Sequence, residues 1–253
     1  MVEFMQKNST GTEIILQQVA FDCMPLYIKN HYVRLKLNKQ YSKKLIIAGS
    51  AAWALNVNDL TQEINVNINQ LIISDGRGNY KNFTEVMENF IIYLKYMAEN
   101  GFEIVFLIGG NDVDLKNLAK DDQIFKHYLE NKLQNLIKIN KFKTYFLVSL
   151  DDWLHCIEEA SLLISGRFHH SIAATCLGTK FIVFNSNTPK VEGLCTLLDC
   201  MDNFINYHDP KLLNKLYDRT KILLNSSLNM NPEKMTLKLS DLAMKNFSHL
   251  KSL

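Results

Sequence analysis

The chain has 253 residues, of which 47% are hydrophobic and 21% charged, so it can bury a core and is not a disordered segment. Lys and Arg total 28 against 26 Asp and Glu, and the formal net charge of +2 gives no overall attraction to nucleic acid. No apolar run approaches the roughly 20 residues of a membrane helix, and no secretory signal is visible, so we expect a cytoplasmic protein.

The five cysteines are odd in number and form no CxxC pair, so we expect reduced thiols, with neither a disulfide framework nor a metal site. Arginine occurs at only four positions, and lysine supplies the rest of the positive charge. The positions of the arginines therefore merit attention.

Short apolar segments alternate with amphipathic ones along the chain. Residues 13–20 and 44–48 are expected strands, which form either the edge of another domain or extra strands on the same sheet. The next expected strands are 70–74, 102–108, 144–149, 162–165 and 180–185, and the expected helices are 84–99, 121–139, 149–160 and 169–177. Two more helices are expected after residue 210, interrupted at Asn231–Pro232, with the second packing back across the domain.

Strands that are apolar throughout and separated by helices indicate a parallel sheet covered on both faces. The predicted fold is therefore a doubly wound, Rossmann-like α/β domain over residues 68–205. Residues 1–67 are expected to form an N-terminal extension or a partial first domain, and residues 206–253 the C-terminal helices.

Ligands bind at the carboxyl ends of the strands in such sheets. Arg77 follows the 70–74 strand between two glycines, where the alternative is an ordinary surface turn. Gly109, Gly110 and Asn111 follow the next strand and offer backbone amides to an anion, although they form neither a P-loop nor a dinucleotide fingerprint.

The segment Ser165-Gly166-Arg167-Phe168-His169-His170-Ser171 is the strongest candidate site. It joins a strand to a helix, whose N-terminus presents free amides and the positive end of its dipole. Arginine adds a fork of donors matched to phosphate or carboxylate, and histidine exchanges protons near neutral pH. Arg167 and His169 are therefore the predicted catalytic pair, whereas His170 fits either a site or the core.

A further polar segment follows the 180–185 strand. Pro189 suits the start of a helix, and Lys190 and Glu192 would lie near the same cleft. The alternative is a capped loop.

Residues 163–193 resemble the polysaccharide pyruvyl transferase family. In that family a strand leads into an Arg-x-His segment, a small-residue helix, a glycine turn, a strand and a Pro-Lys-x-x-Gly-like segment; here these are Arg167–His169 and Pro189–Gly193. The segment Ser74–Gly78 resembles an earlier strand-plus-arginine segment of the family.

The resemblance implies a fold similar to one half of a GT-B glycosyltransferase. It also implies transfer of a pyruvyl group from phosphoenolpyruvate to two hydroxyls of a surface polysaccharide sugar, without a metal or an organic cofactor. Arg167 and Arg77 would hold the donor, and His169 would be the general acid. The His169-His170 doublet leaves open which ring acts. The other expected substrate-binding residues are Gly109, Gly110, Asn111, Gly166, His170, Ser171, Lys190 and Glu192.

The expected partners are the donor and a saccharide acceptor, not nucleic acid, and a lipid-linked acceptor would bring the protein to a membrane surface. Because family members usually carry a full first domain, we expect a C-terminal portion or a member with a reduced first domain. Two alternatives stay open: a GT-B glycosyltransferase whose Glu192 accepts from a ribose, and a non-catalytic remnant or binding domain. The two arginines in predicted loops, Arg77 and Arg167, favour a compact trianion such as phosphoenolpyruvate as the ligand.

Overall fold

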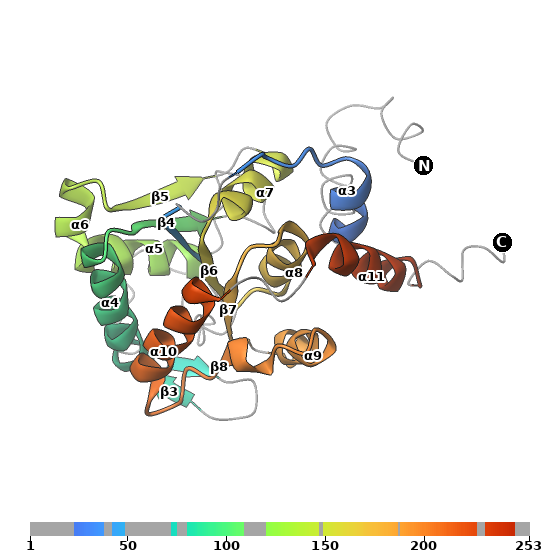
Figure 1. Cartoon of the computed structure of the whole chain (residues 1–253). Coiled ribbons are helices and arrows are strands. Elements are labelled where there is room, and N and C mark those ends of the chain that lie inside the picture. Colours follow the sequence, from blue (N-terminus) through green and yellow to red (C-terminus); the bar gives the residue numbers. More distant parts are fainter. Residues whose placement is uncertain are drawn as a thin grey trace.

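Six parallel strands form one sheet at the centre of the computed structural model, which describes residues 23–37, 42–48, 72–74, 80–108, 120–146, 149–186, 188–226 and 231–245 (Figure 1). The strands are β1 (Lys44–Ala48), β4 (Glu103–Ile108), β5 (Phe142–Phe146), β6 (Leu162–Ser165), β7 (Phe181–Phe184) and β8 (Phe204–Ile205). Their order in the sheet is β5-β4-β1-β6-β7-β8. This is the strand order of dinucleotide-binding folds, so the predicted doubly wound α/β class is confirmed.

Helices cover both faces of the sheet. One face packs against α4 (Phe83–Glu99), α5 (Lys120–Lys132), α6 (Gln134–Lys138) and α10 (Leu212–Asn225). The other face packs against α3 (Met24–Asn30), α7 (Leu150–Glu159), α8 (Phe168–Leu177), α9 (Lys190–Leu197) and α11 (Pro232–Lys245). Successive side chains of a strand point to opposite faces of the sheet. In β1, Leu45 and Ile47 therefore join the first core, whereas Ile46 and Ala48 join the second.

Strand β1 is a central strand rather than part of a separate N-terminal unit. It pairs in parallel with β4 on one side and with β6 on the other. The sheet therefore extends N-terminal to the domain boundary that we predicted at residue 68. The physical reason is that all four described strand residues from Leu45 to Ala48 are buried and need cover on both faces.

The described part of the predicted strand 70–74 does not join the parallel sheet as we expected. Residues Ile72–Ser74 (β2) instead pair antiparallel with Tyr80–Asn82 (β3) in a separate two-stranded sheet. Strand β3 runs directly into α4, and the side chain of Asn82 accepts a hydrogen bond of 2.9 Å from the Thr84 N–H. Asn82 is therefore the N-cap of α4, which begins one residue before the predicted start at 84.

The predicted helix over 121–139 is divided into α5 and α6. Between them Leu133 leaves helical geometry and is buried in the core, while its carbonyl accepts from the N–H groups of Leu136 and Ile137. The chain turns into β5 after α6, where Asn140 has a φ of 54° and the Lys141 N–H donates to the Leu136 carbonyl.

Helix α8 lies in the middle of its layer, between α7, α3, α11 and α9 (Figure 1). Every residue from His170 to Leu177 is buried, as expected for an interior helix. Helix α11 packs against α3 and α8, so the second tail helix does return across the domain. In the part of the chain that the structure describes, no helix combines the length and apolar character needed to cross a bilayer.

Candidate functional site

The direction of the chain through the sheet reverses between β1 and β6. From β1 the chain proceeds to β4 and β5 on one side, and then returns to β6, β7 and β8 on the other. The last residues of the two strands, Ala48 and Ser165, are neighbours in the sheet register. In open α/β sheets the crevice outside such a switch point is where ligands bind. Gly166 and Arg167 follow Ser165 directly, so the strongest predicted segment begins at this point.

Two buried serines hold the backbone of Arg167. The Arg167 N–H donates to Ser165 Oγ at 3.0 Å, and Ser171 Oγ donates to the Arg167 carbonyl at 3.3 Å. Both serine side chains are fully buried. Arg167 is therefore fixed as the residue before α8, with its side chain half-buried. The hydroxyl of Ser171, which we predicted to bind substrate, is engaged with the backbone.

Ser165 was not among the predicted catalytic or substrate-binding residues, although it is the first residue of the candidate segment. In the sequence, a serine stands two residues before Arg167, and a serine hydroxyl can form a hydrogen bond with the backbone of a turn. This spacing is the signal that could have identified Ser165.

The two adjacent histidines have different surroundings. His169 is half-buried in the first turn of α8, and its ring contacts Phe168 edge-on with centroids 5.7 Å apart. His170 is 1% exposed and meets the Trp153 ring edge-on at 4.9 Å. Among the residues that the structure describes, neither ring nitrogen of His170 has a hydrogen-bond partner.

Burial lowers the pKa of His170 well below its ordinary value, and the charge of Arg167 and the neighbouring His169 act in the same direction. A neutral, enclosed imidazole cannot supply a proton to a ligand at neutral pH. Of the two rings, His169 is the one with the exposure that a general acid needs.

Lys190 and Glu192 begin the next helix, α9, which follows β7. Because β7 is the neighbour of β6 in a parallel sheet, both helix starts lie at the carboxyl edge. Lys190 is exposed and Glu192 half-buried. The helix begins directly after Pro189, as predicted.

A family model described as polysaccharide pyruvyl transferase matches residues 31–188, more than half of the chain. This chain belongs to the polysaccharide pyruvyl transferase family. The matched range includes the switch-point strands β1 and β6 and the Arg167–Ser171 segment, and it ends just before Lys190. The family assignment therefore extends over all the predicted site residues except Lys190 and Glu192.

Two solved structures are similar to this pyruvyl transferase family member. One is UDP-GlcNAc 2-epimerase from Methanocaldococcus jannaschii, at 15% identity and a TM-score of 0.46, over 92% of this chain and 52% of that one. The other is the epimerase from that organism in complex with UDP-GlcNAc and UDP, at 12% identity and a TM-score of 0.48, over 88% and 53%. The present chain thus spans about half the length of these structures. The comparison with curated proteins gives no match.

Four predicted site residues, Arg77, Gly109, Gly110 and Asn111, lie outside the described residues. The elements beside them in the chain are described: β2 ends before Arg77 and β3 begins after it, and β4 ends at Ile108. Their part in the site stays a prediction.

The guanidinium groups of Arg34 and Arg219 form hydrogen bonds within the protein. Arg34 donates to the Cys176 carbonyl at 2.8 Å, near the end of α8. Arg219 donates to Asn203 Oδ1 through both Nε and Nη2, at 2.8 and 2.5 Å. Arg167 differs from both because it lies at the switch point.

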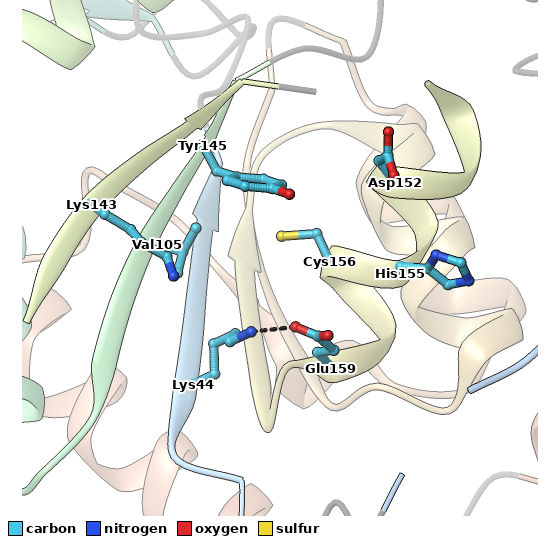
Figure 2. Close-up of a pocket in the computed structure, with 8 residues that line it drawn as sticks. All are labelled: Lys44, Val105, Lys143, Tyr145, Asp152, His155, Cys156 and Glu159. Carbon is cyan, nitrogen blue, oxygen red and sulfur yellow. Dashed lines mark hydrogen bonds and ion pairs between the residues drawn. The ribbon is translucent and has the colours of Figure 1, made fainter. Parts of the chain in front are cut away.

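A polar pocket of about 170 Å³ lies elsewhere, between the β5 side of the sheet and α7 (Figure 2). It is lined by Lys44, Val105, Lys143, Tyr145, Asp152, His155, Cys156 and Glu159, none of which is a predicted site residue. Lys44 is paired with Glu159 across the pocket, and Lys143 with Glu103. The positive charge of each lysine is thus balanced by a carboxylate of the protein.

The Cys156 thiol faces this pocket, below the ring of Tyr145 (Figure 2). Burial raises the pKa of Cys156 to about 12, which keeps the thiol protonated and unreactive. Although Asp152, His155, Cys156 and Glu159 line this pocket, no three His, Cys, Asp or Glu side chains among the described residues are placed to hold one metal ion.

Proposed function

We propose that this protein transfers the pyruvyl group of phosphoenolpyruvate to two hydroxyls of a sugar, as a ketal on a surface polysaccharide. The observation that carries the proposal is the placement of Arg167 and His169 at the start of α8, directly after a switch-point strand. Family membership supports it from the sequence side.

Arg167 suits the donor because phosphoenolpyruvate carries a phosphate and a carboxylate. A guanidinium binds either group through two parallel hydrogen bonds, and the N-terminus of α8 adds its amides and dipole. The two serines that hold the Arg167 backbone reduce the ordering cost of binding. Arg77 would complete the anion site.

His169 would act as the general acid. Its imidazolium donates a proton to the methylene carbon of the donor, and the electrons of the carbon–carbon double bond form the new C–H bond. The first sugar hydroxyl then attacks the electron-poor central carbon and loses its proton. Phosphate leaves with the electrons of its C–O bond, and the second hydroxyl attacks the same carbon and loses its proton, which closes the ketal.

Donor binding tests this proposal without a known acceptor. A ligand at about 100 times its dissociation constant stabilises a fold by roughly 2.7 kcal/mol, so thermal unfolding with phosphoenolpyruvate detects binding. Arg167→Lys should weaken binding about tenfold to a hundredfold, because lysine lacks the bidentate fork.

Arg219→Lys is the matched control, since its guanidinium is engaged with Asn203. It should leave the donor affinity unchanged. A chain that phosphoenolpyruvate does not stabilise, or an Arg167→Lys variant that binds it as tightly as the wild type, would overturn the proposal. Stabilisation by a nucleotide sugar alone would identify a glycosyltransferase instead.

A further inference from the structure

Two cysteines come together at the C-terminal end of α9. The Cys200 N–H donates to the Cys195 carbonyl at 2.9 Å, and the Asp199 N–H donates to the Thr196 carbonyl at 3.2 Å. Asp199 has a φ of 54°, in the left-handed region. These bonds and this backbone conformation define a Schellman motif, which brings together the side chains at the first and last positions of the turn. Here those two positions are Cys195 and Cys200.

A hydrogen bond from the Cys195 thiol to the Cys200 sulfur lowers the pKa of Cys200, and the charge of Arg219 acts in the same direction, whereas burial and the charges of Asp199 and Asp202 oppose this shift. The same bond, together with burial, raises the pKa of Cys195. The pair thus has one thiol whose pKa is lowered and a neighbouring thiol that stays protonated.

The two sulfurs also differ in exposure. Cys195 is 0% exposed, whereas Cys200 is half-buried. Arg219 is held near Cys200 by its bonds to Asn203 and its ion pair with Asp202, with Nη1 and Oδ2 3.7 Å apart. A small reagent can therefore approach the activated sulfur, while the second sulfur is reached only through the first.

We propose that Cys195 and Cys200 form a reversible dithiol–disulfide site whose substrate is a low-molecular-weight disulfide such as glutathione disulfide. Cys200 attacks one sulfur of the reagent, its S–S bond breaks, and one thiolate leaves. Cys195 then loses its proton and attacks the Cys200 sulfur, which releases the second thiol. The two protein thiols are oxidised, and one small disulfide is reduced to two thiols. The site is independent of the proposed pyruvyl transfer.

Peptide mapping of the whole folded chain tests this directly. The protein is incubated with glutathione disulfide, quenched with acid, alkylated under denaturing conditions and digested with trypsin. Both cysteines fall in the single peptide 191–211, which contains no other cysteine. We expect this peptide to lose the mass of two hydrogen atoms and to resist alkylation, and dithiothreitol should restore both thiols.

Two variants separate the steps. Cys195→Ser should trap glutathione on Cys200, because no second thiol resolves the mixed disulfide. Cys200→Ser should leave the buried Cys195 unmodified. Cys156→Ser is the matched control, since that thiol lies in the separate pocket beside α7 and should leave the wild-type disulfide unchanged.

Full alkylation of both cysteines in the treated wild type would overturn the proposal. So would a stable glutathione adduct on Cys200 in the wild type, because Cys195 would then be out of reach. Both readouts use the wild-type chain and do not depend on the folding of a variant.

Discussion

The buried imidazole of His170 leads to a test of stability. Its two ring nitrogens lack hydrogen-bond partners among the described residues, and the ring lies against Trp153. A buried polar group without a partner costs about 1–3 kcal/mol. His170→Leu has a similar volume and removes both polar nitrogens. We therefore expect it to raise the free energy of unfolding at neutral pH by about 1–3 kcal/mol.

The pH dependence gives a second readout of the same substitution. The pKa of His170 is lowered in the folded protein and returns to its ordinary value near 6.5 on unfolding. Below that value the unfolded chain binds a proton that the folded protein does not. The free energy of unfolding should therefore fall as the pH falls below 6.5, with a slope that approaches about 1.4 kcal/mol per pH unit for one proton. His170→Leu should lose this contribution.

Urea unfolding between neutral and mildly acidic pH measures both effects. His127→Gln is the control, because it removes an exposed imidazole from α5 and should leave the difference between wild type and His170→Leu in place. A His170→Leu variant that is less stable than the wild type at neutral pH would refute the reasoning. So would an unchanged pH slope, because the imidazole would then not be held neutral by burial.

Three further substitutions test the α8 segment. Ser165→Ala removes the acceptor of the Arg167 N–H and should cost about 1–3 kcal/mol in urea unfolding; no loss would show that the N–H has another acceptor. Gly178→Ala places a Cβ at a φ of 68° and should cost about 1–2 kcal/mol, whereas a neutral result would contradict the left-handed geometry. His169→Ala should lower ketal formation by about a hundredfold or more with little change in donor affinity, and undiminished turnover would exclude it as the acid.

Local patterns in the sequence were sufficient to predict most of the helices and strands. The strand 162–165 has the predicted bounds, because a short apolar run there is flanked by a polar residue and a glycine. The helix after it ends at Gly178, the residue that can adopt left-handed geometry. The helix start after Pro189 follows from the same kind of local rule.

Pairing between distant segments could not be derived in this way. Nothing in the run Lys44–Ala48 indicates that it lies between β4 and β6, since any of the apolar strands could occupy the centre. Likewise Ile72–Ser74 is apolar enough for the main sheet, yet its nearest partner is the segment Tyr80–Asn82. Strand order depends on which backbone edges meet, and that is a property of the whole chain.

For the candidate site, too, some features could be predicted from the sequence and others depended on the folded structure. The sequence by itself determined that an arginine and two histidines stand between a strand and a helix, where phosphate binding is favoured. Only the tertiary structure decided that this strand borders the switch point and that Trp153 encloses His170 while His169 keeps some exposure. The reason is physical: residue types and their spacing set local backbone geometry, whereas burial and protonation depend on neighbours that folding brings from elsewhere in the chain.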